Sequence, residues 1–264
     1  MVRVLSALVL LPIVLGTIWF LPPIATLLLA LAALVVAFFE YADLAARLGA
    51  PVYLLVSLVA TAATAIAMAT PGSPLDVVFI SALIVVGGLT VGSGQPDAAR
   101  LREAAASLFP LIYLGVPIGA LVAVRASVSR EAVLVLIAII VISDTGQYYA
   151  GRALGRRLLS PSISPKKTVE GAIGGLVAGT AASVALGLYW LPGIAPLSLA
   201  LLGAALVALG IVGDLFESLL KRSAGVKDSS GLIPGHGGLL DRIDSWLFAA
   251  PVYYVFLRYA VMRA

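Results

Sequence analysis

The sequence has no cysteine, a single histidine and few charged residues. The absence of cysteine excludes disulfide bridges and thiolate metal sites. Charged residues make up only 11% of the 264 positions, whereas 61% are hydrophobic, and the mean hydropathy is +1.11. This composition excludes an ordinary soluble domain and is typical of an integral membrane protein. No dinucleotide fingerprint, Walker motif or Ser-His-Asp order is present either.

The apolar residues gather in nine stretches, most of them close to the roughly 20 residues that a helix needs to cross a bilayer. We therefore predict an all-α, polytopic transmembrane protein with about nine spans. The first stretch has no clear small-x-small cleavage site before Leu21, so we expect a retained helix and not a signal peptide. The stretches are approximately 4–20, 24–41, 52–70, 76–92, 105–124, 131–150, 170–190, 196–220 and 246–262.

The distribution of positive charge predicts the orientation. With nine spans, 13 of the 17 lysines and arginines lie at the N-terminus and in the loops after spans 2, 4, 6 and 8. The positive-inside rule places that side in the cytoplasm. We expect a polar active-site pocket facing the cytoplasm, with mainly structural helices in residues 1–130 and the catalytic region in residues 131–264.

One stretch, from Gly210 to Trp246, holds five of the 13 acidic residues. Asp214, Ser218 and Lys221 are spaced i, i+4 and i+7, which places them on one face of a helix. Gly225 is expected to end that helix. Further along, Asp241 and Asp244 are spaced i, i+3 at the start of the last helix and share a face. The only histidine, His236, lies between these helices in a glycine-rich loop.

Three carboxylates of this stretch form a candidate metal site. Asp214 lies in an apolar run, where an ionised group is costly and usually functional, and this argues against an ordinary solvated loop. Carboxylates at this density suit Mg²⁺, which takes hard oxygen ligands and completes its shell with water and substrate phosphates. We predict that Asp214, Asp241 and Asp244 bind Mg²⁺, and a second cation is left open. Neighbouring cations for phosphate groups are Lys221, Arg222, Lys227 and Arg242.

A second polar region begins at Ser143. Asp144 lies at the cytoplasmic end of the sixth span, where it is either functional or an ion-pair partner of Arg152 or Lys166. After it, Lys166 and Lys167 precede a helix that Thr168 is expected to open. Two lysines at a helix N-terminus form an anion site suited to a triphosphate, although the same lysines also fit simple positive-inside charge.

Two further patterns are interpreted as structural. Gly171, Gly175 and Gly179 recur every four residues, a spacing that permits close helix packing. Glu40, Asp43 and Arg47 follow Phe38 and Phe39, and for these three charged residues we favour an interfacial ion-pair cluster over a catalytic role.

The Gly210–Trp246 stretch resembles the signature of a known family, the phosphatidate cytidylyltransferases. That signature runs Ser-x-x-Lys-Arg, then Lys-Asp, then Pro-Gly-His-Gly-Gly, then Asp-Arg-x-Asp. The segments around Asp144 and Lys166 also look like segments of this family, so the resemblance covers about residues 143–250. In this sequence the signature residues are Ser218, Lys221, Arg222, Lys227, Asp228, 234–238, Asp241, Arg242 and Asp244.

The resemblance implies an enzyme that transfers the cytidylyl group of CTP to phosphatidate, giving CDP-diacylglycerol for phospholipid synthesis and releasing pyrophosphate. A phosphate nucleophile is already anionic, so no protein nucleophile is required and catalysis rests on positioning and charge neutralisation. For His236, a structural role and a role in ligand contact or proton transfer are both left open. The expected catalytic residues are Asp214, Asp241, Asp244, Lys221, Arg222 and His236, and the expected substrate-binding residues are Asp144, Lys166, Lys167, Ser218, Lys227, Asp228 and Arg242.

The expected partners are CTP, phosphatidate and membrane lipids, with no nucleic acid, and a homodimer is left open. The expected location is the cytoplasmic membrane, with the active site facing the cytoplasm. Two other functions compete with this one. A related cytidylyltransferase acting on a different lipid phosphate would use the same chemistry. An ion-coupled transporter would also explain intramembrane carboxylates, but transporters often have two matched halves, whereas here the charges gather in one half.

Overall fold

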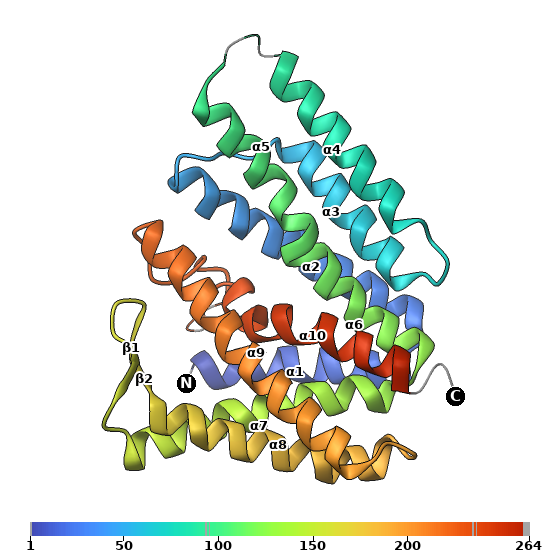
Figure 1. Cartoon of the computed structure of the whole chain (residues 1–264), viewed down its shortest axis with the longest axis vertical. Helices are drawn as coiled ribbons and strands as arrows, with labels where there is room; N and C mark the ends of the chain where they lie inside the picture. The colour runs from blue at the N-terminus through green and yellow to red at the C-terminus, as the bar shows by residue number, and fades with distance from the viewer. Residues whose placement is uncertain (1, 93, 95, 234, 236, 261–264) are drawn as a thin grey trace. The chain divides into compact units, whose positions relative to one another are not determined.

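The computed structural model describes residues 2–92, 94, 96–233, 235 and 237–260, with only the backbone for residues 2–10. Helices form nearly all of the described secondary structure (Figure 1), which confirms the all-α prediction. The N-terminal elements are α1 (Val2–Phe20), α2 (Pro23–Arg47), α3 (Leu54–Ala69), α4 (Leu75–Gly92), α5 (Ala98–Pro110), the π-helical segment η1 (Leu111–Gly115) and α6 (Val116–Ser127). The later elements are α7 (Arg130–Leu154), β1 (Leu158–Ser160), β2 (Ser164–Thr168), α8 (Val169–Trp190), α9 (Pro196–Ser223) and α10 (Leu240–Ala260).

Six of the described helical segments are long and apolar enough to cross a membrane, and α5, η1 and α6 together make one of them. Two shorter apolar helices, Leu11–Phe20 and Leu54–Ala69, coincide with expected spans. Each of the nine expected stretches thus has a helical counterpart among the described residues. The structure thus agrees with the prediction of an all-α membrane protein, whereas the number of nine spans stays a prediction.

The chain divides into two compact units. Unit 1 comprises Met1–Ala123 and Leu220–Ile243, and unit 2 comprises Val124–Leu219 and Asp244–Ala264. The segment 220–243, which carries much of the signature, therefore belongs to the same unit as the N-terminal helices. The predicted division into mainly structural helices in residues 1–130 and a catalytic region in residues 131–264 concerns function and stays a prediction. Each unit is described by itself below.

In unit 1, α3 packs against α2, α4 and η1. The approach of η1 and the start of α6 to α3 is close because two glycines, one in each segment, face α3. A Cβ atom at Gly115 would lie 2.8 Å from the Thr61 carbonyl oxygen, and one at Gly119 would lie 2.5 Å from the Ala65 carbonyl oxygen. Pro110, which has no N–H to donate, directly precedes the π-helical turn.

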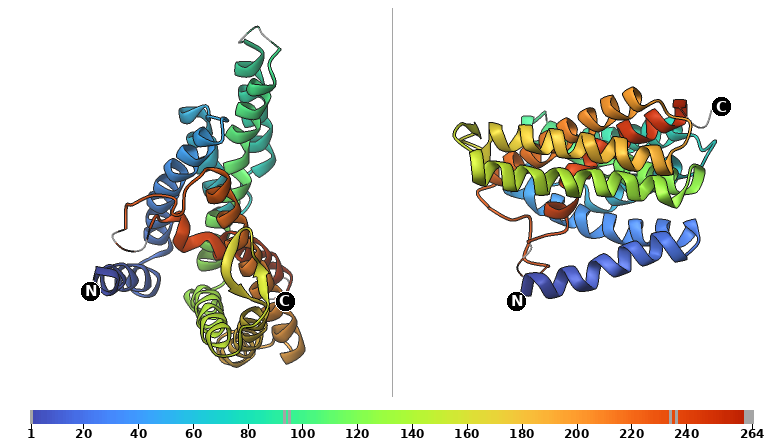
Figure 2. Two further views of the ribbon diagram at one scale, coloured as in Figure 1. Left: turned by 90° about the vertical axis from the view of Figure 1, so that its left-hand side faces the viewer. Right: turned by 90° about the horizontal axis from the view of Figure 1, so that it is seen from below.

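In unit 2, α7 and α8 lie side by side along their length (Figures 1 and 2). Glycines on α8 permit this close approach. A Cβ atom at Gly171 would lie 2.9 Å from the Gln147 carbonyl oxygen, and one at Gly175 would lie 2.3 Å from the Gln147 Cγ. At Gly179 the nearest atom would be Val207 Cγ2, at 2.4 Å. The prediction that this glycine spacing serves helix packing is confirmed.

The β1–β2 hairpin connects these two helices and carries both predicted phosphate-binding lysines. The hairpin itself was not expected from the sequence. The Thr168 hydroxyl accepts a hydrogen bond from the Gly171 backbone N–H and caps α8, as predicted. Glu170, in the first turn of α8, accepts hydrogen bonds from the backbone N–H groups of Arg156 and Arg157. Together these contacts fix the chain that enters and leaves the hairpin.

Candidate active site

The first group of candidate residues lies in unit 2 and joins α7, β2 and α9. The Lys167 ammonium group on β2 forms an ion pair with Asp214 Oδ2 on α9. Asp144 on α7 interacts electrostatically with both Asp214 and Lys167. The Ser218 hydroxyl, one turn beyond Asp214, lies 3.5 Å from its Oδ1. The structure therefore brings together four residues that the sequence assigned separately to nucleotide and metal.

The positions of the two lysines differ within this group. Lys167 is partly buried and bound to Asp214, whereas Lys166 is exposed on the hairpin. Gln147 donates a hydrogen bond of 3.0 Å to Asp144 Oδ1. The ion-pair alternative considered for Asp144 named Arg152 or Lys166, and the interaction that the structure gives is with Lys167. The ammonium group of Lys166 is exposed next to the Lys167–Asp214 ion pair, so it is accessible to a phosphate group.

The second group lies in unit 1, around the carboxylate of Asp241. Asp241 Oδ1 forms an ion pair with Lys221, and its side chain is only 5% exposed. Oδ2 accepts three hydrogen bonds: from the Ser229 backbone N–H at 2.9 Å, the Ser229 hydroxyl at 2.9 Å and the Gly238 backbone N–H at 2.7 Å. Burial alone would raise the pKa of Asp241, but the bonds from Lys221, Gly238 and Ser229 outweigh it and hold the pKa below its ordinary range.

Backbone geometry explains the glycines of this loop. Gly225 has φ +73° after the end of α9, and the Val226 N–H bonds back to the Lys221 carbonyl, which closes the helix as predicted. Gly237 has φ +80°, and a Cβ atom there would lie 2.6 Å from Asp241 Oδ2. His236, for which two roles were left open, and Pro234 lie outside the described residues.

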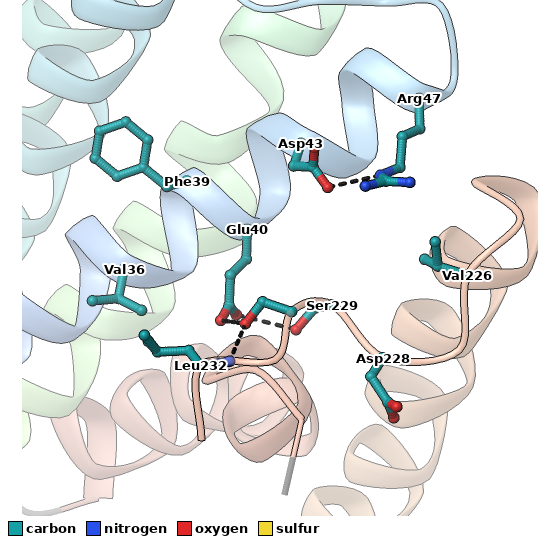
Figure 3. A pocket seen from close by; sticks show the side chains of 10 residues that line it. Val36, Phe39, Glu40, Asp43, Arg47, Val226, Asp228, Ser229 and Leu232 are labelled. Atoms are coloured by element: carbon teal, nitrogen blue, oxygen red, sulfur yellow. Dashed lines mark hydrogen bonds and ion pairs between the residues drawn. The ribbon is translucent and has the colours of Figure 1, made fainter. Parts of the chain in front are cut away.

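Glu40 on α2 is a further member of the second group, and sequence reasoning missed it. The interpretation of Glu40, Asp43 and Arg47 as one ion-pair cluster is wrong for Glu40. Asp43 and Arg47 do form an exposed ion pair of 2.7 Å. Glu40 points away from them toward the loop that carries Ser229 (Figure 3) and is only 5% exposed. Its position after an apolar run, like that of Asp214, was the signal that could have identified it.

A pocket of about 470 Å³ opens beside Glu40 and Ser229 in unit 1 (Figure 3). Its wall combines apolar side chains of α2 and the loop with the Asp43–Arg47 ion pair. A ligand could therefore approach the Glu40–Ser229 contact from this side. The pocket is lined by Val36, Phe39, Glu40, Asp43, Arg47, Val226, Asp228, Ser229, Ser230 and Leu232.

The remaining predicted residues make local contacts or are exposed. Asp244 follows Asp241 by one turn of α10, and its Oδ1 accepts a 2.6 Å hydrogen bond from the Ser245 N–H. Arg222 is exposed near the end of α9 and lies 3.4 Å from the Val226 carbonyl. The other exposed members are Lys227, Asp228 and Arg242. Exposed cations of this kind are accessible to phosphate groups.

The predicted metal site needs a separate comparison with the structure. The part of the chain that the structure describes contains no group of three or more aspartate, glutamate or histidine side chains arranged to hold a metal ion. Carboxylate oxygens nevertheless fit Mg²⁺ chemically, and Asp144 and Asp214 already act on one shared positive charge, that of Lys167. The assignment of Mg²⁺ to Asp214, Asp241 and Asp244 stays a prediction from the sequence.

Comparison with known proteins identifies similar sequences. A family model described as the cytidylyltransferase family matches residues 1–260. The phosphatidate cytidylyltransferase of Helicobacter pylori strain 26695 is 37% identical over 180 residues, which cover 68% of this chain and 64% of that protein. That of Pseudomonas aeruginosa strain PAO1 is 49% identical over 116 residues, covering 44% and 43%. The uncharacterised protein YnbB of Escherichia coli strain K12 is 47% identical over 130 residues, covering 48% and 42%. The matches thus span less than two thirds of the length of these relatives.

Proposed function

Because the chain belongs to the cytidylyltransferase family, we propose that it transfers the cytidylyl group of CTP to phosphatidate. A phosphatidate oxygen would attack the α-phosphorus of CTP, forming a new P–O bond, while the bond from the α-phosphorus to the bridging oxygen breaks and pyrophosphate leaves. The observation that carries the proposal is a pair of carboxylate–lysine contacts between candidate site residues: Lys167–Asp214, which is partly exposed, and Lys221–Asp241, which is buried. Both relatives named phosphatidate cytidylyltransferase support it.

The residues have distinct roles in this proposal. Lys166 and Lys167 contact the triphosphate, with Asp144 beside them. Lys221, Arg222, Lys227 and Arg242 offset phosphate charge, and Ser218 and Asp228 contact substrate. Mg²⁺ is proposed at Asp214, Asp241 and Asp244 because of their spacing in the sequence, and when bound it would neutralise negative charge on the phosphates. The carboxylate partners hold the ammonium groups of Lys167 and Lys221 in place, so these groups are preorganised for an anionic ligand.

The direct test follows transfer of label from CTP to lipid. Purified full-length protein in detergent micelles is incubated with cytidine-labelled CTP and phosphatidate, with Mg²⁺ or with excess EDTA. We expect a lipid-soluble CDP-lipid and pyrophosphate in equal amounts, only when phosphatidate and Mg²⁺ are both present. Product formed with another lipid phosphate but not with phosphatidate would instead indicate the related cytidylyltransferase. A wild-type protein that forms no CDP-lipid under any of these conditions contradicts the proposal.

The two lysines of the hairpin should determine the affinity for CTP. Replacing Lys166 and Lys167 together with glutamine should raise the KM for CTP about tenfold or more, because each charge-assisted contact contributes roughly 1.5–3 kcal/mol. The KM for phosphatidate should change by less than about twofold. Lys166→Gln alone should affect only the KM for CTP, since it leaves the Lys167–Asp214 pair intact. Initial rates with each substrate varied in turn give the two constants.

The control for this experiment is Arg130→Gln, which removes a cation from the opposite end of α7. It should leave both KM values unchanged. If the double lysine variant raises the two KM values equally, the lysines have a structural role and do not bind the triphosphate.

The protein is proposed to lie in the cytoplasmic membrane with the 226–239 loop on the cytoplasmic side. The chain has no cysteine, so a single introduced thiol is the only one that can react. Gly231 is suitable because it is exposed and a Cβ atom there would meet nothing within 4 Å. Gly231→Cys should resist a membrane-impermeant maleimide on intact cells and react after permeabilisation. Thr70→Cys, at the end of the third expected span, should react from outside. Labelling of Gly231→Cys in intact cells would reverse the orientation.

A further inference from the structure

We propose that Glu40 of α2 is a positioning residue of the active site, which fixes the loop before α10 and, through Ser229, the carboxylate of Asp241. The inference deepens the proposed function and rests on it for its kinetic consequences. Its structural part concerns only unit 1, which contains both α2 and the loop. Glu40 would act through other residues and would not itself contact substrate.

The Glu40 carboxylate accepts four hydrogen bonds, all from residues 189 to 200 positions later in the chain. Oε1 accepts from the Ser230 hydroxyl at 2.6 Å and the Leu239 N–H at 2.9 Å. Oε2 accepts from the Leu240 N–H at 2.7 Å and the Ser229 hydroxyl at 3.1 Å. A buried carboxylate is costly unless its oxygens are satisfied, and here both are. An apolar side chain would cost less but could not hold these four donors.

The anchor reaches Asp241 through one shared serine. The Ser229 hydroxyl lies 3.1 Å from Glu40 Oε2 and 2.9 Å from Asp241 Oδ2. One hydroxyl hydrogen can be donated to only one of two carboxylates at a time, so Ser229 links them as alternatives. The Ser229 backbone N–H donates to Asp241 as well. Moving the Ser229 main chain therefore moves two of the three donors that hold Asp241 Oδ2.

Glu40 also occupies the N-terminus of α10. Leu240, whose N–H it binds, is the first residue of that helix, and Asp241 follows directly. A carboxylate at a helix N-terminus satisfies free N–H groups and complements the helix dipole. Two of the amides that a helix N-terminus offers to a phosphate are thus already bound, those of Leu239 and Leu240. These two amides are therefore not available to a phosphate group of a substrate.

The glycine at position 238 is required by the same contact. A Cβ atom there would lie 2.0 Å from the Ser229 hydroxyl oxygen and 2.5 and 2.6 Å from the two Glu40 oxygens. No side chain fits without displacing either Ser229 or Glu40. The second glycine of the Gly237–Gly238 pair is therefore explained by a residue almost 200 positions earlier in the sequence.

Glutamine at position 40 is the most informative substitution because it keeps the shape of the side chain. Its amide has one oxygen, so its NH₂ group must face the N–H of either Leu239 or Leu240. Two donors then oppose each other, and the backbone N–H cannot rotate away. The matched control is Glu103→Gln, the same substitution at another carboxylate of unit 1, which forms an ion pair with Arg100 on α5 and should have little effect.

Two measurements on the full-length protein test the proposal. Amide hydrogen exchange should show at least about tenfold faster exchange at Leu239 and Leu240 in Glu40→Gln, with α7 and α8 unchanged. The kcat for CDP-lipid formation should fall about 10- to 100-fold, as for other residues that orient a catalytic group. The KM for CTP should stay within about twofold, because Lys166 and Lys167, the proposed triphosphate ligands, lie in unit 2. A loss of general stability would instead speed exchange throughout the protein.

Two further variants cover the case in which Glu40→Gln does not fold. Ser230→Ala removes one hydrogen-bond donor to Glu40 and should speed amide exchange in the loop to a smaller extent. Gly238→Ala keeps Glu40 but adds a methyl group that should displace the Glu40 carboxylate from the loop. Wild-type exchange at Leu239 and Leu240 in the folded members of this set overturns the proposal. So does wild-type kcat in a variant whose loop exchanges fast. If the wild type makes no CDP-lipid, the proposed function fails, and the exchange measurement alone decides whether Glu40 anchors the loop.

Discussion

Replacing Asp214 with asparagine should lower the kcat for CDP-lipid formation by at least about 100-fold, while the protein remains folded. The Asp214 carboxylate is the charged partner of Lys167, and asparagine retains its shape but removes its charge. A 100-fold loss corresponds to roughly 2.7 kcal/mol, the scale of one lost electrostatic stabiliser. The fold should persist because Asp214 and Lys167 are 32% and 20% exposed, so water can solvate the lysine that loses its partner.

The measurement is a Mg²⁺ titration of the initial rate for the wild type and Asp214→Asn. If Asp214 binds the metal, the variant should need more Mg²⁺ to reach its reduced maximal rate. Asp76→Asn, at the exposed start of α4, is the control and should behave as wild type. A near-native rate for Asp214→Asn at low Mg²⁺ would show that Asp214 contributes neither to metal binding nor to catalysis.

Local sequence patterns were sufficient for most of the fold. The apolar stretches identified helices, Thr168 identified the start of α8, and Gly225 identified the end of α9. These features depend on residues within a few positions of one another, so one sequence contains the information. The glycine spacing on α8 was sufficient to predict packing but not its partner, because the partner helix is selected by tertiary contacts.

The candidate site was predictable as a set of residues but not as a set of contacts. Lys167 and Asp214 are 47 positions apart, and each had a plausible separate role. Their ion pair follows from the placement of the β1–β2 hairpin, which three- and five-residue strands signal only weakly. Glu40 was missed for a different reason. Asp43 and Arg47 are at helical spacing and offered a local ion-pair explanation for the whole cluster. The argument that had identified Asp214, that an ionised group after an apolar run is energetically costly and usually functional, was therefore not applied to Glu40.

Replacing Asp241 with asparagine should abolish at least about 99% of the activity and, unlike Asp214→Asn, should also destabilise the loop that precedes α10. Asp241 Oδ1 contacts the Lys221 ammonium group, while Oδ2 accepts from two backbone N–H groups and a hydroxyl. An asparagine NH₂ group would face donors in either orientation. Each buried donor left unsatisfied costs about 1–3 kcal/mol, and Lys221 would also lose its charged partner.

The pH dependence of stability provides a test of this prediction that needs no activity assay. The bonds from Lys221, Ser229 and Gly238 hold the pKa of Asp241 below its ordinary value of about 4, against the opposing effect of burial. A carboxylate whose pKa is lowered by folding stabilises the native state above its unfolded-state pKa, and this contribution disappears as the pH falls through the lowered pKa. The thermal midpoint of the wild type should therefore exceed that of Asp241→Asn by a constant margin from pH 8 to about pH 5. Below about pH 4 the margin should shrink, and a margin that instead grew on acidification would mean that Asp241 is not stabilised as an anion.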